Sequence, residues 1–447
     1  MRASDPKPFG IYIQVPFCQT KCTYCNFHTG VASPAAYAPY ARAVEREIRD
    51  WRALHAAAGL ASSGRPNTNE QPSSEVVEPE KDGSPRESHG HQELSRVNKD
   101  IKPFFAPKTD TIYLGGGTPS LFDPADLSRI LEAVRSQFCA GRTGSGGTST
   151  EVTLEADPET ITPEKAAAWL ASGINRISLG AQSFHDAELK PAGRMHRRED
   201  IFTAIARLRA AGFANISLDL IAGLPHQTAA SWQASVEEAL RLRPEHISIY
   251  LFEIDEGSRL GKEILSGGAR YSAAAVPSDD AMAESYEFAC ERLARAGYEH
   301  YEISNWALPG FRSRHNLKYW RREPYLGFGA GAHSFDGHWR WANAHDPAAY
   351  AAAIEQGRLP VEQLEEVTPK MALDEELFLG LRQLEGIDLA RIESQYGSQL
   401  NAPIGARIEE LRAQGLVERS GTRVRLAPAR LAVSNEVFVA LLDSSDP

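Results

Sequence analysis

Short apolar runs recur along the chain, and a stretch with helical periodicity follows each one. Six runs are typical of buried strands: Ile11–Val15, Thr111–Leu114, Glu151–Glu155, Arg176–Leu179, Ile216–Ile221 and His246–Leu251. Asp123 precedes Pro124, and Thr162 precedes Pro163, which places a capping side chain before proline at a helix start. Repeated β–α units predict a parallel sheet with right-handed crossovers. The fold class is therefore α/β, and we expect a partial (β/α)6 barrel, about three quarters of a TIM barrel.

Two polar stretches interrupt this pattern, and a third change marks the C-terminal part. Residues 62–107 are rich in Pro, Ser and Glu, which predicts a disordered insertion, and residues 141–150 have the composition of a flexible loop. After Thr368, short helical patterns lead into a β-hairpin pattern over Gly415–Leu426. We therefore expect a barrel over residues 1–305, a connecting region over 306–367, and a small helical, winged-helix-like domain over 368–447.

Residues with useful chemistry follow the predicted strands. The carboxyl ends of barrel strands meet on one rim, where such folds place their active sites. The six strands lead in turn to Cys18, to Gly115–Pro119, to Glu155 and Asp157, to Gln182, to Asp219 and to Glu253. We expect these groups to face one another.

Three cysteines stand just after the first strand. Cys18, Cys22 and Cys25 have the spacing C-x₃-C-x₂-C, and three thiolates can hold three irons of a [4Fe–4S] cluster while the fourth iron stays open. This spacing resembles that of radical S-adenosylmethionine (SAM) proteins, in which the amino acid end of SAM chelates the open iron. A Cys₃His zinc site completed by His28 is the alternative. Disulfides are disfavoured, because five cysteines is an odd count and the other two are far away.

Composition limits the classes of partner and the compartment. The chain has 447 residues and a net charge of −11, from 48 basic and 59 acidic side chains, which argues against a general nucleic-acid binder. No apolar run reaches membrane-spanning length, and no signal-peptide pattern precedes the cysteines. We expect a protein of the reducing cytoplasm.

Several rim residues suit a ligand of this kind. Gly116 and Gly117 leave the backbone bare for close approach, and the carboxylate of Glu155 suits ribose hydroxyls. Arg194 is able to clamp a carboxylate bidentately, with a solvated surface arginine as the alternative reading. Asp219 lies within an apolar strand and needs a partner, which SAM or Arg194 would supply.

The order of these motifs along the chain resembles that of the HemN family, the oxygen-independent coproporphyrinogen III dehydrogenases. The resemblance covers nearly the whole chain apart from the polar insertion. It implies that Tyr12, Gly116 and Glu155 serve one SAM. It also implies further contacts near that SAM, or near a second one, from Tyr24, Gly117, Thr118, Gln182, Arg194 and Asp219.

Three features separate the chain from the oxidase branch of that family. Phe27 stands where the oxidases carry a fourth cysteine, and only 17 residues precede Cys18. The run His315-Asn-Leu-Lys-Tyr-Trp320 resembles the HNxxYW motif of the haem chaperone branch, HemW. The alternative is a buried aromatic cluster around a hydrogen-bonded histidine, which would have the same sequence. A glycine-rich apolar loop leads to His333, so His315 and His333 are the candidate axial ligands of haem.

The resemblance therefore implies a haem chaperone that holds a [4Fe–4S] cluster, SAM and haem. Its partners would be haem-accepting proteins, with no nucleic acid and no transmembrane segment. Peripheral contact with membrane haem proteins and a homodimer are left open. The alternative is an enzyme of porphyrin biosynthesis that oxidatively decarboxylates coproporphyrinogen III, an activity that we expect to be absent. A zinc-stabilised scaffold is the third reading.

Overall fold

A computed structural model describes residues 8–63, 109–139 and 149–442. The predicted insertion at 62–107 and the predicted loop at 141–150 lie outside these residues, apart from positions at their ends. All statements below concern the described residues.

Six parallel strands form the centre of the fold. They are β1 (Gly10–Val15), β4 (Thr111–Gly116), β5 (Glu151–Ala156), β6 (Arg176–Gln182), β7 (Ile216–Ala222) and β8 (His246–Leu251), and they are neighbours in that order. These are the six predicted strands; β8 has the predicted bounds, and the other five are longer by one to three residues. The prediction of a partial (β/α)6 barrel is confirmed.

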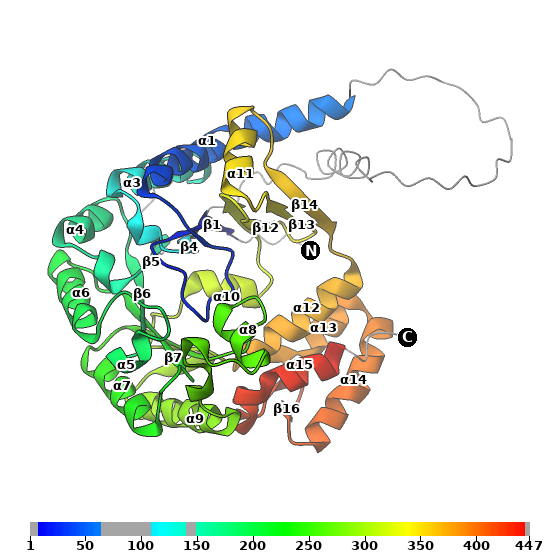
Figure 1. The fold of residues 1–447 in the computed structure, drawn as a ribbon. Coiled ribbons are helices and arrows are strands. Elements are labelled where there is room, and N and C mark those ends of the chain that lie inside the picture. The colour runs from blue at the N-terminus through cyan, green and yellow to red at the C-terminus, as the bar shows by residue number, and fades with distance from the viewer. Residues whose placement is uncertain (1–7, 64–108, 140–148, 443–447) are drawn as a thin grey trace, which may run out of the picture.

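Helices cover the outside of this curved sheet (Figure 1). They are α1 (Tyr37–Ser63), α3 (Pro124–Phe138), α4 (Pro163–Ala171), α6 (Arg198–Ala211), α7 (Ala229–Arg241) and α9 (Asp279–Arg295), while the short helices α5 (Asp186–Leu189) and α8 (Arg259–Leu265) lie close to the cysteine loop in the chain segments that bond to it. The side chains of Asp123 and Thr162 accept hydrogen bonds from the first turns of α3 and α4, as the sequence predicts. Fully buried Trp169 and Trp232 anchor α4 and α7 in the hydrophobic core.

The sheet continues beyond the barrel on both sides. Beside β1 lies β11 (Tyr325–Phe328), which is parallel to it, followed by antiparallel β12 (His333–Phe335), β13 (Trp339–Asn343) and β14 (Val361–Glu366). Beside β8 lie β10 (Asn305–Ala307) and β9 (Glu299–Glu302). Residues 306–367, expected to connect two domains, therefore extend the barrel sheet, and they also carry α10 (Arg314–Trp320) and α11 (Pro347–Glu355).

The C-terminal part is a small unit of helices with a three-stranded sheet. Its helices are α12 (Pro369–Arg382), α13 (Leu389–Tyr396), α14 (Ser398–Ala413) and α15 (Ser434–Leu442), and its strands are β15 (Ile387–Asp388), β16 (Val417–Ser420) and β17 (Arg423–Leu426). Strands β16 and β17 form the predicted hairpin. This unit lies beside the open side of the barrel (Figure 1).

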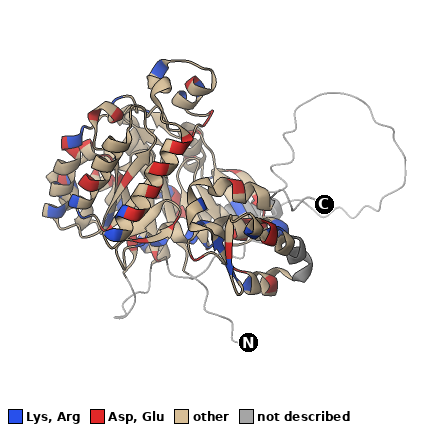
Figure 2. Ribbon diagram, turned by 90° about the horizontal axis from the view of Figure 1, so that it is seen from below, with Lys and Arg blue, Asp and Glu red and all other residues tan. Residues whose placement is uncertain are grey.

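The surface is chemically mixed. In Figure 2, Lys and Arg share the helices with Asp and Glu and do not gather on one face of the view. No helix in the described parts of the chain has the length and apolarity needed to cross a membrane. The expectations about nucleic acid and compartment stay predictions.

Candidate functional site

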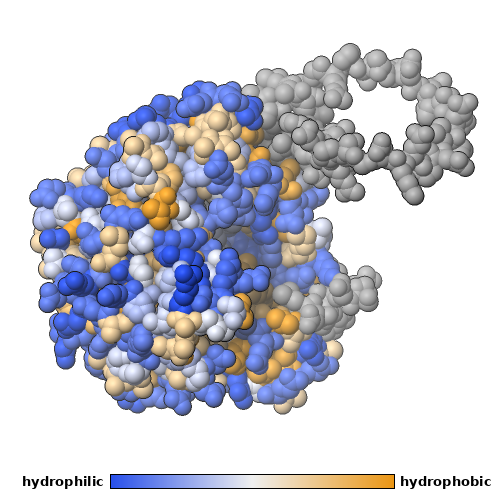
Figure 3. Space-filling model, in the orientation of Figure 1, coloured by the Kyte–Doolittle hydropathy of each residue, from blue (hydrophilic) through white to orange (hydrophobic). Residues whose placement is uncertain are grey.

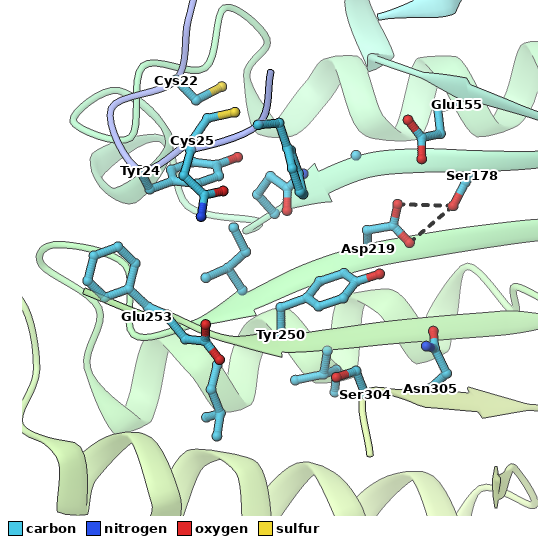
Figure 4. A pocket seen from close by; sticks show the side chains of 18 of the residues that line it. Cys22, Tyr24, Cys25, Glu155, Ser178, Asp219, Tyr250, Glu253, Ser304 and Asn305 are labelled. Atoms are coloured by element: carbon cyan, nitrogen blue, oxygen red, sulfur yellow. Dashed lines mark hydrogen bonds between the residues drawn. The ribbon is translucent and has the colours of Figure 1, made fainter. Parts of the chain in front are cut away.

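A cavity of about 620 Å³ opens at the carboxyl ends of the barrel strands. The face shown in Figure 3 is hollowed between the barrel and the C-terminal unit. Eight of the nine predicted cofactor residues line this cavity, together with the three cysteines: Cys18, Cys22, Tyr24, Cys25, Gly116, Gly117, Thr118, Glu155, Gln182, Arg194 and Asp219. The structure thus brings these residues together at one rim, as the sequence predicts. Figure 4 shows several of them facing the same space.

The cysteine loop is fixed by backbone contacts to the barrel. It begins in the short strand β2 (Phe17–Cys18) and ends in β3 (Gly30–Val31), which pair in parallel. Within the loop, the backbone N–H of Thr23 donates to the carbonyl of Ala192 at 3.0 Å, and the carbonyl of Thr23 accepts from Leu260 at 2.8 Å. These bonds hold the three thiols at the mouth of the barrel.

The donor set suits an iron–sulfur cluster. All three cysteines are free and half-buried, and the guanidinium Nη1 of Arg194 lies 3.5 Å from the Cys22 Sγ. Burial raises the pKa of the Cys18 and Cys25 thiols, so metal binding must displace their protons. Three thiolates around an open cavity leave room for a ligand on the fourth iron of a [4Fe–4S] cluster.

The geometry does not favour the zinc alternative. Among the described residues, no three His, Cys, Asp or Glu side chains converge closely enough to hold one metal ion. Tetrahedral zinc would bring its sulfur ligands to about 3.8 Å from one another. His28 does not join the cysteines either, because its ring packs on His345, with ring centroids 4.1 Å apart.

The glycines after β4 make the close approach that the sequence indicates. Gly116 has φ +106°, and its N–H donates to the Glu155 carboxylate at 3.0 Å. A Cβ on Gly117 would lie 2.5 Å from the carbonyl oxygen of Phe17, so no side chain fits there. The Thr118 hydroxyl donates to Asp157 at 3.1 Å. Backbone and carboxylates thus form one continuous wall.

Glu155 is the buried carboxyl of this wall. The Tyr113 hydroxyl donates to it at 2.8 Å. Burial, reinforced by the nearby charge of Asp219, raises the pKa of Glu155 to about 7. The carboxyl therefore changes charge near neutral pH.

Arg194 and Asp219 have different partners from those expected. Arg194 forms an ion pair with Asp157 and donates to the Gly180 carbonyl at 2.8 Å. Asp219 accepts instead from the Ser178 hydroxyl at 3.0 Å (Figure 4) and from the Ser217 hydroxyl at 3.3 Å. The interpretation that Arg194 would pair with Asp219 is wrong, because Arg194 pairs with Asp157, while Ser178 on β6 and Ser217 on β7 itself satisfy the Asp219 carboxyl. Burial still raises its pKa.

Tyr12 is the one predicted cofactor residue that does not line the cavity. Its ring stacks on Tyr113, with ring centroids 6.0 Å apart, and its hydroxyl donates to Gln14 at 2.8 Å. A role for the Tyr12 side chain toward SAM stays a prediction.

The two candidate haem ligands occupy different environments. His315, on α10, is buried, and its two ring nitrogens are bonded to the hydroxyls of Thr111 and Tyr319, each at 2.9 Å. Burial lowers the pKa of His315 to about 3. Neither ring nitrogen of His315 is available to iron in this conformation. The geometry therefore favours the alternative reading, in which His315 is a buried histidine with both nitrogens hydrogen-bonded. His333 is exposed at the start of β12, outside the cavity.

Other residues of the HNxxYW motif do reach the cavity. Asn316, Tyr319 and Trp320 line it from α10. The motif therefore places an amide and two aromatic rings at the site, while its histidine supports them from behind.

Sequence reasoning missed part of the lining. Tyr250, Ser304 and Asn305 face the cavity from the β8–β10 edge (Figure 4), and the buried Glu302 beside them has its pKa raised to about 7 by burial. The C-terminal unit adds Arg382, Leu431, Ala432, Ser434 and Asn435. Tyr250 lies near the end of the predicted strand His246–Leu251, which is the signal that could have found it.

Comparisons with known proteins agree with this geometry. Residues 12–239 match the model of the radical SAM superfamily, and residues 367–429 match that of the HemN C-terminal domain. The chain is 31% identical to the haem chaperone HemW of Bacillus subtilis, over 96% of this chain and 98% of that protein. It is 34% identical to HemW of Lactococcus lactis, over 78% and 89%. The fold resembles that of Escherichia coli coproporphyrinogen III oxidase, with a TM-score of 0.72 and 20% identity over 98% and 90%.

Proposed function

Since the chain belongs to the radical SAM superfamily and, within it, to the HemW family, we propose that it binds haem and delivers it to acceptor proteins. We also propose a [4Fe–4S] cluster on Cys18, Cys22 and Cys25, and SAM in the adjacent cavity. The observation that carries the proposal is the likeness to HemW proteins along almost the whole chain, joined to three free cysteines at one cavity. The proposed setting is the reducing cytoplasm, where such thiolates persist.

Residues at the carboxyl ends of the barrel strands would hold SAM. When bound, the cluster would offer its open iron to the amino acid end of SAM. The bare backbone at Gly116 and Gly117 would accept the ammonium group, and Glu155 would accept hydrogen bonds from the ribose hydroxyls. Arg194, already paired with Asp157, would stay in contact with the Cys22 sulfur.

Haem binding and transfer test the proposal. Reconstituted protein is titrated anaerobically with haem and then mixed with a haem-free acceptor protein. We expect stoichiometric haem binding, followed by transfer that requires contact between the two proteins. Absence of haem binding by cluster-loaded protein would refute the chaperone function and leave only the radical SAM architecture.

SAM affinity should depend on pH through Glu155. The raised pKa, about 7, means that the carboxyl is mostly protonated below pH 7 and ionised above it. An ionised carboxylate accepts hydroxyl hydrogen bonds with both oxygens, so SAM affinity should rise with pH, by up to about tenfold per pH unit below the pKa. Isothermal titration between about pH 6 and pH 8 measures this.

The Glu155→Gln variant is the matched control, because glutamine keeps the shape and does not titrate. Five other carboxyls line this cavity, so a pH dependence that survives unchanged in Glu155→Gln would assign the effect to one of Asp157, Asp219, Glu253, Asp255 and Glu302.

A further inference from the structure

Three histidines that are distant in the sequence meet beside the cysteine loop. His28 lies between β2 and β3, His333 begins β12, and His345 follows β13. The rings of His28 and His345 are in contact, with centroids 4.1 Å apart and an angle of 50° between their planes. His345 also acts electrostatically on His333, which places it beside both rings. We call His28, His333 and His345 the rim histidines.

The rim histidines have unused ring nitrogens. Within the described chain, no hydrogen bond engages a ring nitrogen of these three residues, whereas the rings of His55, His196, His246, His300 and His315 are all bonded. The Nδ1 of His345 is buried without a partner and faces Gly331, where a Cβ would come within 3.1 Å. Partial desolvation, and after it the nearby His345, lower the pKa of His28 and of His333, which favours the neutral imidazole that binds metal.

An apolar surface borders these rings. Phe27 and Val31 flank His28 on the cysteine loop, and their side chains are 68% and 64% exposed. Phe27 directly precedes His28 and Val31 follows it by three residues, so exposed apolar side chains on both sides of His28 in the sequence offer contact area to a flat apolar ligand. The ammonium of Lys21 lies at the same loop, donating to the carbonyls of Phe27 and Thr29 at 3.4 and 3.3 Å. The surface thus combines imidazole, apolar area and a cation.

This combination suits haem better than a bare metal ion. A bare ion needs three or more protein ligands, and no group of three His, Cys, Asp or Glu side chains among the described residues is arranged to hold one. Haem iron already has four porphyrin nitrogens and takes only one or two axial ligands from protein. Haem also brings a flat apolar face and two propionates, which match Phe27, Val31 and Lys21.

We propose that the rim histidines are the iron-ligating site for haem cargo, with the porphyrin lying over Phe27 and Val31. At least one imidazole of the His28–His345 pair binds the iron, and Lys21 faces a propionate. The inference rests on the proposed function and names its haem site. It moves the iron ligand from the enclosed His315 to the rim. It also places haem next to the cluster, because His28 follows Cys25 by three residues on the same loop.

Haem titration of the full chain with its cluster reconstituted tests this site. The variants are the double substitution His28→Ala with His345→Ala, and His338→Ala as the matched control. His338 is exposed, lies at the opposite end of the β12–β13 hairpin, and pairs with Glu366 at 3.1 Å. The readouts are haem affinity and the sharp visible bands of imidazole-bound ferrous haem, which stand apart from the broad absorption of the cluster.

We expect the double variant to lose at least about tenfold in haem affinity and to lose the imidazole bands, while His338→Ala matches the unmodified protein. Unchanged iron content and circular dichroism would show that the double variant is folded. If the unmodified protein binds haem and the double variant binds it equally with the same spectrum, the rim site is refuted and the proposed function stands. If the unmodified protein binds no haem, both fail.

Discussion

Cys22→Ala should abolish iron–sulfur cluster binding. We expect about four irons per chain in the anaerobically reconstituted protein and essentially none in the variant. The reason is that the cavity offers three thiolates for three irons, and removing one leaves two irons without a protein ligand. Arg194 would also lose its contact with the Cys22 sulfur, now at 3.5 Å. Iron analysis and visible absorption of the two proteins measure the result.

Cys290→Ala is the matched control for this prediction. Cys290 lies on α9, and burial raises the pKa of its thiol to about 12, which keeps it protonated and inert. Its removal should leave iron content unchanged. Full iron content in Cys22→Ala, or stoichiometric zinc with no iron uptake in protein made anaerobically with ample iron, would overturn the assignment of the cluster.

The barrel was predictable because its strands carry a repeated local signal. Buried runs such as Ile216–Ile221 read directly as strands, and the caps at Asp123 and Thr162 fixed helix starts. The extension of the sheet was not predictable in the same way. Strand β14 reads Val-Glu-Gln-Leu-Glu-Glu and is mostly exposed, and β12 has only three residues. Such strands form because they pair with neighbouring strands. Their own amino-acid composition therefore does not identify them as strands.

The candidate site, like the fold, has residues that the sequence could predict and residues that only the tertiary structure reveals. The cysteines and the residues at strand ends were found because barrel topology sends strand ends to one rim. Glu302 and Asn305 escaped notice because they lie at the antiparallel edge beside β8, and Leu431 to Asn435 because docking of the C-terminal unit brings them in. The partners of Asp219 depend on the register between β6 and β7, which sets Ser178 beside it and which periodicity alone does not fix.

Purified, cluster-loaded protein should fail to convert coproporphyrinogen III to protoporphyrinogen IX with SAM under reducing, anaerobic conditions. The cavity wall argues for this result as strongly as the sequence does. Six acidic residues line it, Glu155, Asp157, Asp219, Glu253, Asp255 and Glu302, against the three basic residues Lys21, Arg194 and Arg382. A porphyrinogen with four propionates would find few cations there to pair with. Arg194, moreover, is already paired with Asp157.

Space gives a second reason. Pockets of roughly 300–1,000 Å³ enclose a single drug-sized ligand, so a cavity of about 620 Å³ suits SAM without a tetrapyrrole beside it. Phe27, in place of the fourth cysteine of the oxidases, turns an exposed apolar ring outward from the loop. Product analysis by chromatography, with the Escherichia coli oxidase as positive control, measures turnover. SAM-dependent decarboxylation that disappears in Cys22→Ala would show that this chain is an oxidase after all. Turnover that persists in Cys22→Ala would point instead to a contaminating enzyme, because the reaction needs the electron that only the cluster supplies.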